Sequence, residues 1–414
     1  MKKFTKAIAI LLSLAMIFAF AGCSVETAQE GQDDVQATQA QENLYANIKI
    51  GFIFLHDPTA STYDNNFYQA ALNVKEKLGL SDDQMMFKWG IPEEGSDCYD
   101  TAAEFIDAGC NIIFADSFGH ESNMLLAAKE YPEVEFLHAT GTQALVAGVS
   151  NFHNAFASIY DGRFLAGIAA GMKLNEMITN GEITAEQAKI GYVGAHPYAE
   201  VKSGYTSFFL GARYVCPSAT MEVVFTNSWF DIALEKEGAN KLIDDGCVLI
   251  SQHADSEGAP KACEQAGVPN IAYNISTIDL GPTTSIISSK INWEPYFEMA
   301  ITNAANGEEI PANWCGTLET GSVELTELNE AAAAAGTADA IEEARAKLIS
   351  GELHVFDTST FTVDGKTLDS YLADVEDMGD YIGETEAVAD GYFHESEFRS
   401  APYFDVDIDG ITLK

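Results

Sequence analysis

Two apolar runs of strand length, 221–225 and 247–251, each end in side chains suited to binding a ligand. The residues that follow these runs include Trp229, Asp231, His253 and Asp255. In open α/β sheets, ligands bind outside the carboxyl ends of the strands. An indole ring can stack on a flat molecule, while carboxylate and imidazole groups bind its polar edges. This part of the chain therefore predicts a site for a flat, hydrogen-bonding ligand.

Similar side chains follow the apolar runs in the first half of the chain. These further candidates are Asp57, Tyr63, Phe67, Asp116, Ser117 and Phe118. Their rings have an alternative role in core packing, and Asp231 can also cap the helix that follows it. The carboxylates at the strand ends can either bind a neutral polar ligand or act in acid–base chemistry. A binding protein and an enzyme both remain open at this point.

Motifs for other chemistries are missing from the sequence. No G-x-G-x-x-G follows the first apolar run, and neither G-x-x-x-x-G-K-[ST] nor G-x-S-x-G occurs. The eight histidines are dispersed, with no H-E-x-x-H or H-x-H pair among them. We therefore expect no metal site and no bound cofactor, and we assign no catalytic residues.

Apolar runs alternate with amphipathic stretches, which indicates parallel βαβ units. The expected strands are 48–55, 85–89, 111–115, 134–138, 189–193, 221–225, 247–251, 269–273 and 284–289. The expected helices are 64–78, 97–108, 121–130, 155–177, 199–213, 231–245, 257–266, 292–306 and 331–348. The pattern predicts two α/β lobes, with junctions near 150–160 and 274–285. Small residues in the helix at 155–177 indicate close packing against a neighbouring helix.

The N-terminus has the pattern of an export signal. Basic residues precede the apolar stretch 7–21, which is too short for a convincing membrane span. The stretch ends in Phe-Ala-Gly before Cys23, and this resembles a bacterial lipoprotein signal in which that cysteine carries the lipid, including palmitate. An ordinary secretory signal is the alternative. The polar segment 24–47 is typical of a flexible tether.

The chain is strongly acidic, with a formal net charge of −41 that becomes about −44 without the three lysines of the signal. Binding to nucleic acid requires a basic face, so we exclude a nucleic-acid partner. About 370 residues remain after the signal and tether, which suggests two domains.

Six cysteines remain besides Cys23, an even number that permits disulfides in an exported chain. They are Cys98, Cys110, Cys216, Cys247, Cys263 and Cys315. None forms a C-x-x-C pair, and the sequence does not determine which of them would pair.

The last hundred residues differ in character from the rest. Segments 361–368 and 406–413 each have an Asp-Gly turn between alternating apolar residues, which predicts two β-hairpins. Asp405, Asp407 and Asp409 also imitate the start of a calcium loop. That loop would need a glutamate beyond the last residue, so the hairpin is the preferred interpretation.

A series of motifs resembles the basic membrane protein family, the lipoprotein substrate-binding components of ABC transporters that are related to purine nucleoside receptors. The motifs are GCNIIFADSFGH, YPEVEFLHATG, NAFASIYDGRFLAGIAAG, GYVGAHPYAEV, VVFTNSWFD, SQHADS and GPTTSIISSKINWEPY. The resemblance spans about 48–355. It implies two α/β lobes of the periplasmic-binding type (type I-like), each a mostly parallel sheet flanked by helices, joined by three crossovers. A nucleoside or nucleobase would bind in the cleft between the lobes.

The resemblance also divides the chain and places its partners. It implies a signal at 1–22, a tether at 23–47, an N-terminal lobe at 48–155 and 275–315, a C-terminal lobe at 156–274 and 316–355, and an extension at 356–414. The protein would be a monomer anchored by lipid to the outer face of a bacterial cell membrane. It would deliver a small-molecule ligand to ABC permease and ATPase subunits. A nucleoside hydrolase and a ligand sensor without transport are the alternatives.

Carried over by position, the family's binding residues include Tyr63 in the first loop and Asp116 and Ser117 after the third strand. The remaining positions are Trp229, Asp231, His253, Asp255 and Asn274. Two departures bear on the ligand: the first loop reads HDPTASTYDNNFY, and Asn274 stands where relatives often have aspartate, which would change contacts to a ribose.

Overall fold

The computed structural model describes residues 44–375 and 382–414. The predicted signal segment, Cys23 and all but the last few residues of the tether lie outside this part of the chain. No helix within the described residues combines the length and the apolarity needed to cross a bilayer.

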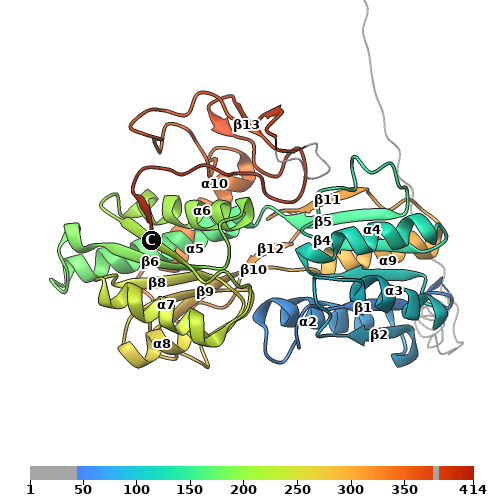
Figure 1. The fold of residues 1–414 in the computed structure, drawn as a ribbon. Coiled ribbons are helices and arrows are strands. Elements are labelled where there is room, and N and C mark those ends of the chain that lie inside the picture. Colours follow the sequence, from blue (N-terminus) through green and yellow to red (C-terminus); the bar gives the residue numbers. More distant parts are fainter. Residues whose placement is uncertain (1–43, 376–381) are drawn as a thin grey trace, which may run out of the picture. The chain divides into compact units, whose positions relative to one another are not determined.

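A six-stranded sheet forms the first lobe, with all its strands parallel and in the order β11-β5-β4-β3-β1-β2 (Figure 1). Its strands are β1 (Ile50–Ile53), β2 (Met85–Lys88), β3 (Ile112–Ala115), β4 (Glu135–Ala139), β5 (Phe152–Ala157) and β11 (Asn313–Gly316). The helices packed on it are α2 (Thr62–Leu78), α3 (Asp97–Asp107), α4 (Glu121–Glu130) and α9 (Glu294–Asn306). All residues of β1 are buried, as expected of a parallel strand with helices on both faces.

The second lobe is a seven-stranded sheet in the order β12-β10-β9-β8-β6-β7-β17, in which only β12 is antiparallel. Its strands are β6 (Lys189–Gly194), β7 (Thr220–Phe225), β8 (Leu249–His253), β9 (Asn270–Tyr273), β10 (Ser285–Ile291), β12 (Val323–Leu325) and β17 (Ile411–Leu413). Its helices are α5 (Ile159–Thr179), α6 (Ala199–Val215), α7 (Ile232–Asp244), α8 (Gly258–Ala266) and α10 (Thr337–Ser350).

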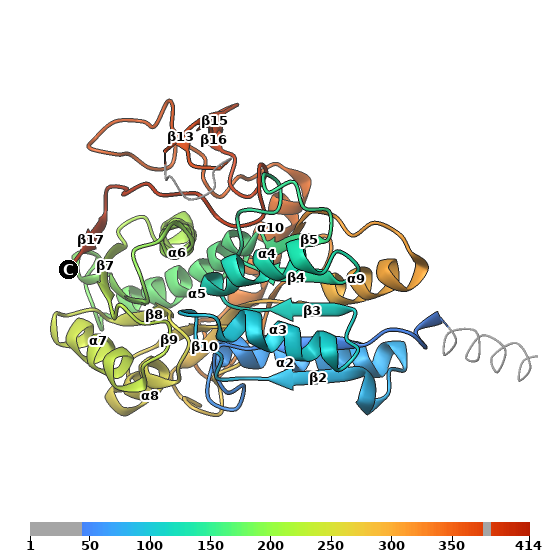
Figure 2. The ribbon, with the colours of Figure 1, turned by 45° about the vertical axis from the view of Figure 1, so that its right-hand side comes forward.

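Helices α5 and α6 lie side by side in both views of the chain (Figures 1 and 2). Glycines allow their backbones to approach closely. A Cβ added at Gly167 would lie 2.0 Å from the carbonyl oxygen of Phe208, and one at Gly211 would lie 2.0 Å from that of Phe164. The close packing predicted from small residues is confirmed.

The chain passes between the two sheets three times: between β5 and α5, between β10 and α9, and between β11 and β12. The second passage is predicted at residue 275 but follows Ile291 in the structure. The reason is that β10 pairs with β9 and so belongs to the second sheet. Strand β5 falls partly in the stretch expected as the start of a helix at 155–177.

The C-terminal segment packs on the second lobe, and its apolar residues join the core cluster of α5 and α6. Its short strands are β13 (Leu372–Ala373), β14 (Thr385–Glu386), β15 (Val388–Ala389) and β16 (Tyr392–Phe393). The prediction of a hairpin at 406–413 is wrong, because β17 pairs in parallel with β7. At 361–368 the turn forms, with a single antiparallel bridge between Val363 and Lys366.

The six cysteines within the described residues are all free thiols. Five of them are buried, and Cys315 is half-buried. Cys247 lies just before β8, and burial raises the pKa of its thiol to about 12, so it stays protonated and unreactive.

Candidate functional site

A cavity of about 360 Å³, counted with its opening to solvent, lies at the carboxyl ends of strands from both sheets. Its described lining residues are Leu55, Tyr63, Ser117, Phe118, Thr140, Glu200, Trp229, His253, Asp255 and Tyr273. Leu55, Ser117 and Thr140 follow β1, β3 and β4, whereas Asp255 follows β8 and Tyr273 ends β9. This is the position at which open α/β sheets bind ligands.

Two aromatic rings stand on the first lobe's side of the cavity. Tyr63, in the first turn of α2, donates its hydroxyl hydrogen to the carbonyl oxygen of Asp116 at 2.8 Å. Helix α2 is fixed there by Ser61, whose hydroxyl caps the amide of Asp64. Phe118, just after β3, leaves 40% of its surface exposed. An exposed apolar ring at a cavity wall is available to stack on a ligand.

Trp229 is the main aromatic residue on the second lobe's side. It is half-buried and lies between β7 and α7. Its ring centroid is 5.0 Å from that of His196 and 6.1 Å from that of Tyr198. Its carbonyl oxygen accepts a hydrogen bond of 2.9 Å from the amide of Asp255, which ties the loop to the end of β8.

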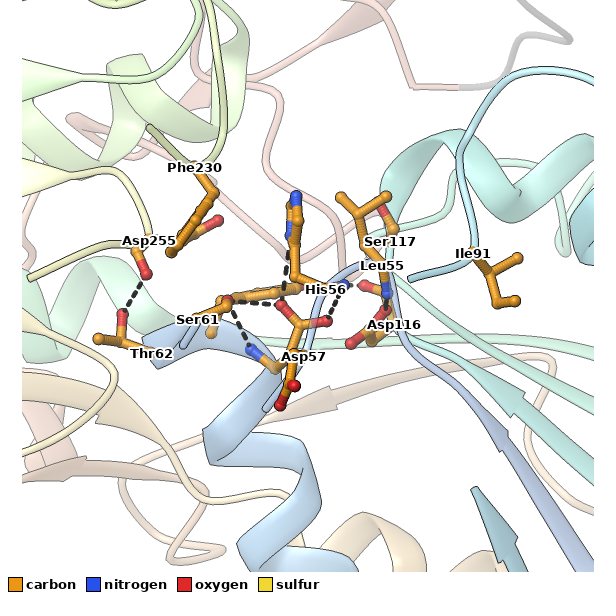
Figure 3. Close-up of polar contacts among 12 residues, drawn as sticks. Leu55, His56, Asp57, Ser61, Thr62, Ile91, Asp116, Ser117, Phe230 and Asp255 are labelled. Atoms are coloured by element: carbon orange, nitrogen blue, oxygen red, sulfur yellow. Dashed lines mark hydrogen bonds and ion pairs between the residues drawn. The ribbon is translucent and has the colours of Figure 1, made fainter. Parts of the chain in front are cut away.

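The two lobes touch beside the cavity. The backbone amide and the hydroxyl of Thr62 both donate to the carbonyl oxygen of Asp255, at 2.8 and 3.1 Å. Figure 3 shows Thr62 directed toward Asp255. The rings of His56 and Phe230 meet with their centroids 5.2 Å apart. Contacts between the start of α2 and the end of β8 therefore hold the two walls together.

Buried carboxyl groups surround this contact. Oδ1 of Asp116 accepts from the amide of Leu55 at 3.1 Å, and burial together with nearby Asp64 raises the pKa of Asp116 well above its usual value. Burial, with Glu235 as the largest of the neighbouring charges, also raises the pKa of Asp255 well above its usual value. When protonated, such carboxyl groups donate a hydrogen bond as well as accept one.

His253 is held neutral by its surroundings. Burial, and to a smaller extent the guanidinium of Arg163, lowers the pKa of His253 to about 4. Its Nε2 lies 3.4 Å from Oε1 of Glu200, and Nδ1 has no hydrogen-bond partner within the described chain. Its ring stands edge-on to that of Tyr273, with centroids 5.1 Å apart. A neutral imidazole can serve the cavity as one donor and one acceptor.

Arg163, in α5, supports one wall of the cavity from behind. It is 1% exposed, donates through Nη1 to the carbonyl oxygen of Gln252 at 2.8 Å, and places its guanidinium carbon 3.5 Å from the ring centroid of Tyr273. Its Nε and Nη2 have no partner among the residues that the structure describes. The attraction between a cation and an aromatic face is strongest where the cation is desolvated. The buried guanidinium of Arg163 therefore holds the ring of Tyr273 in place.

Replacing Arg163 with methionine is expected to raise the pKa of His253 above about 4, because it removes a positive charge that opposes protonation. The rise should be less than the whole shift, since burial is the larger cause. NMR titration of the imidazole measures it. Lys202→Met is the matched control, because Lys202 pairs with Asp405 and Asp407 instead and should leave the titration unchanged. Equal titrations in wild type and Arg163→Met would contradict this role.

The structure brings six of the residues predicted from sequence to the cavity. These are Tyr63, Ser117, Phe118, Trp229, His253 and Asp255. Asn274 lies just outside the lining, with its amide nitrogen 3.5 Å from Oδ1 of Asp255. Asp116 lies behind it as the acceptor for Leu55.

The other three predicted residues have structural contacts instead. The carboxylate of exposed Asp57 accepts from the amide and hydroxyl of Thr59. Phe67 is 0% exposed, and its ring stacks on Trp293 with centroids 4.4 Å apart. Asp231 caps α7 through the amides of its first turn, the alternative already weighed for it. The ligand-binding role assigned to these three stays a prediction.

Four lining residues are not among those predicted from the sequence: Leu55, Thr140, Glu200 and Tyr273. Tyr273 directly precedes Asn274 at the end of an expected strand, and Glu200 begins an expected helix just after another strand. Their position after the strands is the same signal that identifies His253 and Asp255, and it could have found them. No group of three potential metal ligands occurs within residues 44–375 and 382–414.

Two lobes with parallel sheets, three crossovers and a cavity at the facing strand ends define a binding protein of the periplasmic type. The chain belongs to the PnrA-like family of ABC transporter substrate-binding proteins (Bmp), whose model matches residues 59–358. The resemblance noted from the sequence motifs is thereby confirmed. The family consists of solute-binding proteins rather than enzymes.

Relatives with different names share about the same identity with this chain. A putative ABC transporter glucose-binding protein of Haloferax volcanii is 31% identical over 279 residues, which cover 67% of this chain and only 63% of that protein. A purine-binding protein of Brucella abortus is 30% identical over 321 residues, which cover 77% and 85% of the two chains. The solved structure of an ABC transporter solute-binding protein from Aeropyrum pernix superposes with a TM-score of 0.61 at 17% identity, over 75% of this chain and 93% of that one.

Proposed function

We propose that this chain is a lipid-anchored solute-binding protein that captures a nucleoside or nucleobase-like molecule between its lobes for an ABC importer. The cavity carries this proposal. It combines four aromatic side chains, those of Tyr63, Phe118, Trp229 and Tyr273, with buried hydrogen-bonding groups at the strand ends. Rings of this kind stack on a flat base, and the polar groups suit its edges and a sugar. The Brucella relative named for purine binding supports the same ligand class.

The charge of the lining favours an uncharged ligand. Among the residues described, the cavity is lined by Glu200 and Asp255 and by no lysine or arginine. A phosphate group would approach the carboxylate of Glu200 without a cation in the lining to offset the repulsion. We therefore favour nucleosides over nucleotides.

Calorimetric titration with guanosine, adenosine, guanosine monophosphate and glucose tests the proposed ligand class. We expect a nucleoside to bind, the monophosphate to bind at least about tenfold more weakly, and glucose to bind weakly or not at all. Mass spectrometry of molecules that co-purify with the protein identifies its natural ligand. Preference for glucose, the ligand in the Haloferax relative's name, would overturn the proposal.

Recovery of the ligand separates a binding protein from the alternative of a nucleoside hydrolase. After prolonged incubation, a binder returns the nucleoside intact, whereas a hydrolase releases free base and ribose. Chromatography of the incubated sample distinguishes them. An ATPase and permeases that co-purify with the protein from membranes would favour import over sensing.

The lipid anchor gives a separate prediction. Cys23→Ala should abolish lipid attachment and move the protein from the membrane fraction to the soluble fraction, because no other segment of the sequence is proposed to hold it there. Fractionation and mass analysis of the N-terminal peptide measure this. Ser24→Ala is the matched control and should stay with the membrane. Retention of Cys23→Ala in the membrane fraction would contradict the anchor and leave the ligand assignment untouched.

A further inference from the structure

Three hydroxyl groups that line the cleft cavity have their hydrogens bound within the protein. Tyr63 donates to the carbonyl oxygen of Asp116 at 2.8 Å. Ser117 donates to Oε1 of Glu93 at 2.5 Å, and Thr140 donates to the carbonyl oxygen of the residue before it at 2.6 Å. A hydroxyl group whose hydrogen is already bound keeps only its lone pairs for a ligand. These three side chains therefore offer acceptors to the cavity.

Glu200 adds a carboxylate to these acceptors from the second lobe. It stands in the first turn of α6, and 14% of its side chain is exposed. Its Oε1 lies 3.4 Å from Nε2 of His253, and no lysine or arginine pairs with it among the residues that the structure describes. Burial, followed by the charge of Glu200, raises the pKa of the Tyr63 hydroxyl well above its usual value. The acceptors of the two lobes therefore lie within electrostatic range of each other across the cavity.

Thr140 is held in a backbone conformation that residues of its type seldom adopt. Its φ is 63°, in the left-handed region, where a β-branched residue is an outlier. Its amide donates to the carbonyl oxygen of Ala155 at 3.1 Å, and the residue is 4% exposed. Backbone strain of this kind persists where the surrounding structure fixes it, and it clusters at ligand sites. A strained, oxygen-bearing residue directly after β4 in the cavity wall indicates a binding role.

Donors are fewer than acceptors in the same lining. Tyr273 has a further hydroxyl group, but its oxygen is buried and has no partner within the described chain. The indole of Trp229 carries one N–H group. Burial raises the pKa of Asp255 well above its usual value, so its carboxyl group can supply one more donor. A ligand that complements this lining brings several N–H or O–H donors of its own.

We propose that the cleft selects a base with two adjacent N–H donors, as on the N1 and 2-amino edge of guanine, and that Glu200 recognises this edge. The proposal rests on the nucleoside-binding function proposed above. The two oxygens of a carboxylate accept from two parallel N–H groups in one plane. Adenine presents a lone pair at N1, which a carboxylate repels, and hypoxanthine lacks the 2-amino group. Tyr63 and Thr140 accept from the remaining donors of the ligand.

Calorimetric titration of the full chain with guanosine, inosine and adenosine tests this selectivity. Inosine is guanosine without its 2-amino group, so it is the matched probe for one donor. We expect guanosine to bind at least about tenfold more tightly than either of the others, because hydrogen bonds to a charged group are the stronger ones. Inosine or adenosine binding as tightly as guanosine would overturn the selectivity and leave nucleoside binding intact. Absence of binding by all three would refute the nucleoside function itself, and this proposal with it.

Glu200→Gln assigns the recognition to its residue. The glutamine amide presents one acceptor and one donor, a pattern that complements the 6-amino group and N1 of adenine. We expect guanosine binding to weaken about 10- to 100-fold and adenosine binding to stay equal or become tighter. Glu237→Gln is the matched control, because Glu237 is exposed on α7 outside the lining, and both affinities should stay within about twofold. An unchanged ratio of guanosine to adenosine affinity in Glu200→Gln would refute the assignment.

Thr140→Val and Thr140→Ser test the acceptors without altering Glu200. Valine keeps the branched shape and loses the oxygen, whereas serine keeps the hydroxyl group. We expect Thr140→Val to weaken guanosine binding about 3- to 10-fold and Thr140→Ser to bind within about twofold of wild type. Should Thr140→Val fail to fold, Tyr63→Phe takes its place with the same expected loss, since it removes an acceptor and keeps the ring. Equal affinities in the valine and serine variants would show that Thr140 contributes no acceptor to the ligand.

Discussion

Trp229→Ala is expected to weaken nucleoside binding about 5- to 150-fold. The indole lines the cavity and is only half-buried, so part of its surface is accessible to a base. Stacking of a base on an aromatic side chain contributes about 1–3 kcal/mol, and each 1.4 kcal/mol is tenfold in affinity. The loop itself should survive the substitution, because the backbone of Trp229 and not its side chain holds the amide of Asp255.

Two other variants make the Trp229 measurement specific. Trp229→Phe keeps a flat ring and should lose much less affinity than the alanine variant. Trp89 is 49% exposed and does not line the cavity, so Trp89→Ala should bind as wild type does. Melting curves recorded beside the titrations detect a packing role, since Trp229 also touches the core of the second lobe. A destabilised Trp229→Ala protein with normal affinity would show that this ring packs and does not stack.

The sequence correctly predicts those cavity residues whose position is determined by the strand that directly precedes them. Trp229, His253 and Asp255 follow apolar runs directly, and the ends of parallel strands meet at one edge of a sheet. Asp57 follows such a run too, but its carboxylate turns back to Thr59. Glu200 reaches the cavity only because α6 packs with its N-terminal end directed toward His253. Such orientations depend on tertiary packing, which a local pattern does not contain.

The difference between local pattern and tertiary packing also explains which parts of the fold are predicted correctly. Strand and helix alternation predicts the two parallel sheets correctly, since buried strands are recognisable from short apolar runs. The end of β5 is predicted as helix, because Ala155 and Phe156 continue directly into the apolar stretch of small residues that forms α5. At the C-terminus, Asp409 accepts from the amide of Gly365, so one predicted turn binds the other. The last strand then pairs with the open edge of β7, a distant partner that supplies unpaired backbone groups.

Buried ionisable groups make the stability of this fold depend on pH in two opposing ways. Burial lowers the pKa of His120 and His253 to about 4, so their neutral forms support the fold and stability falls as the pH drops below about 6.5. Burial raises the pKa of Glu235 to about 7 and that of Glu395 to about 8, which acts in the other direction. Above about pH 6.5 the contribution of the histidines is complete while the buried acids still ionise, so stability should decline toward pH 8.

Glu395→Gln isolates the largest of these shifts. Glu395 is 2% exposed, and its pKa of about 8 compares with about 4.3 in an unfolded chain, because burial outweighs the hydrogen bonds it accepts and the charge of Arg399. The protonated acid supports the fold below about pH 4.3, and this support is lost as the pH rises through about 8. Glutamine has the same size and does not ionise. Relative to wild type, the variant should gain about 3–5 kcal/mol in free energy of unfolding between pH 4.5 and pH 8.5.

Urea unfolding of both proteins across this pH range measures the difference in free energy of unfolding. Only the change of this difference with pH is interpreted, so any constant effect of the new amide group drops out. Glu386→Gln is the matched control in the same segment. Its exposed carboxylate accepts from Ser370 and from the amide of Tyr371, and these hydrogen bonds lower its pKa. Removing that charge should therefore lower stability as the pH rises, the opposite sign to the effect of Glu395→Gln.

A difference between Glu395→Gln and wild type that does not change with pH would mean that Glu395 is ionised in the folded protein. The C-terminal segment would then hold a buried charge against the core of the second lobe, with Arg399 as its compensating partner.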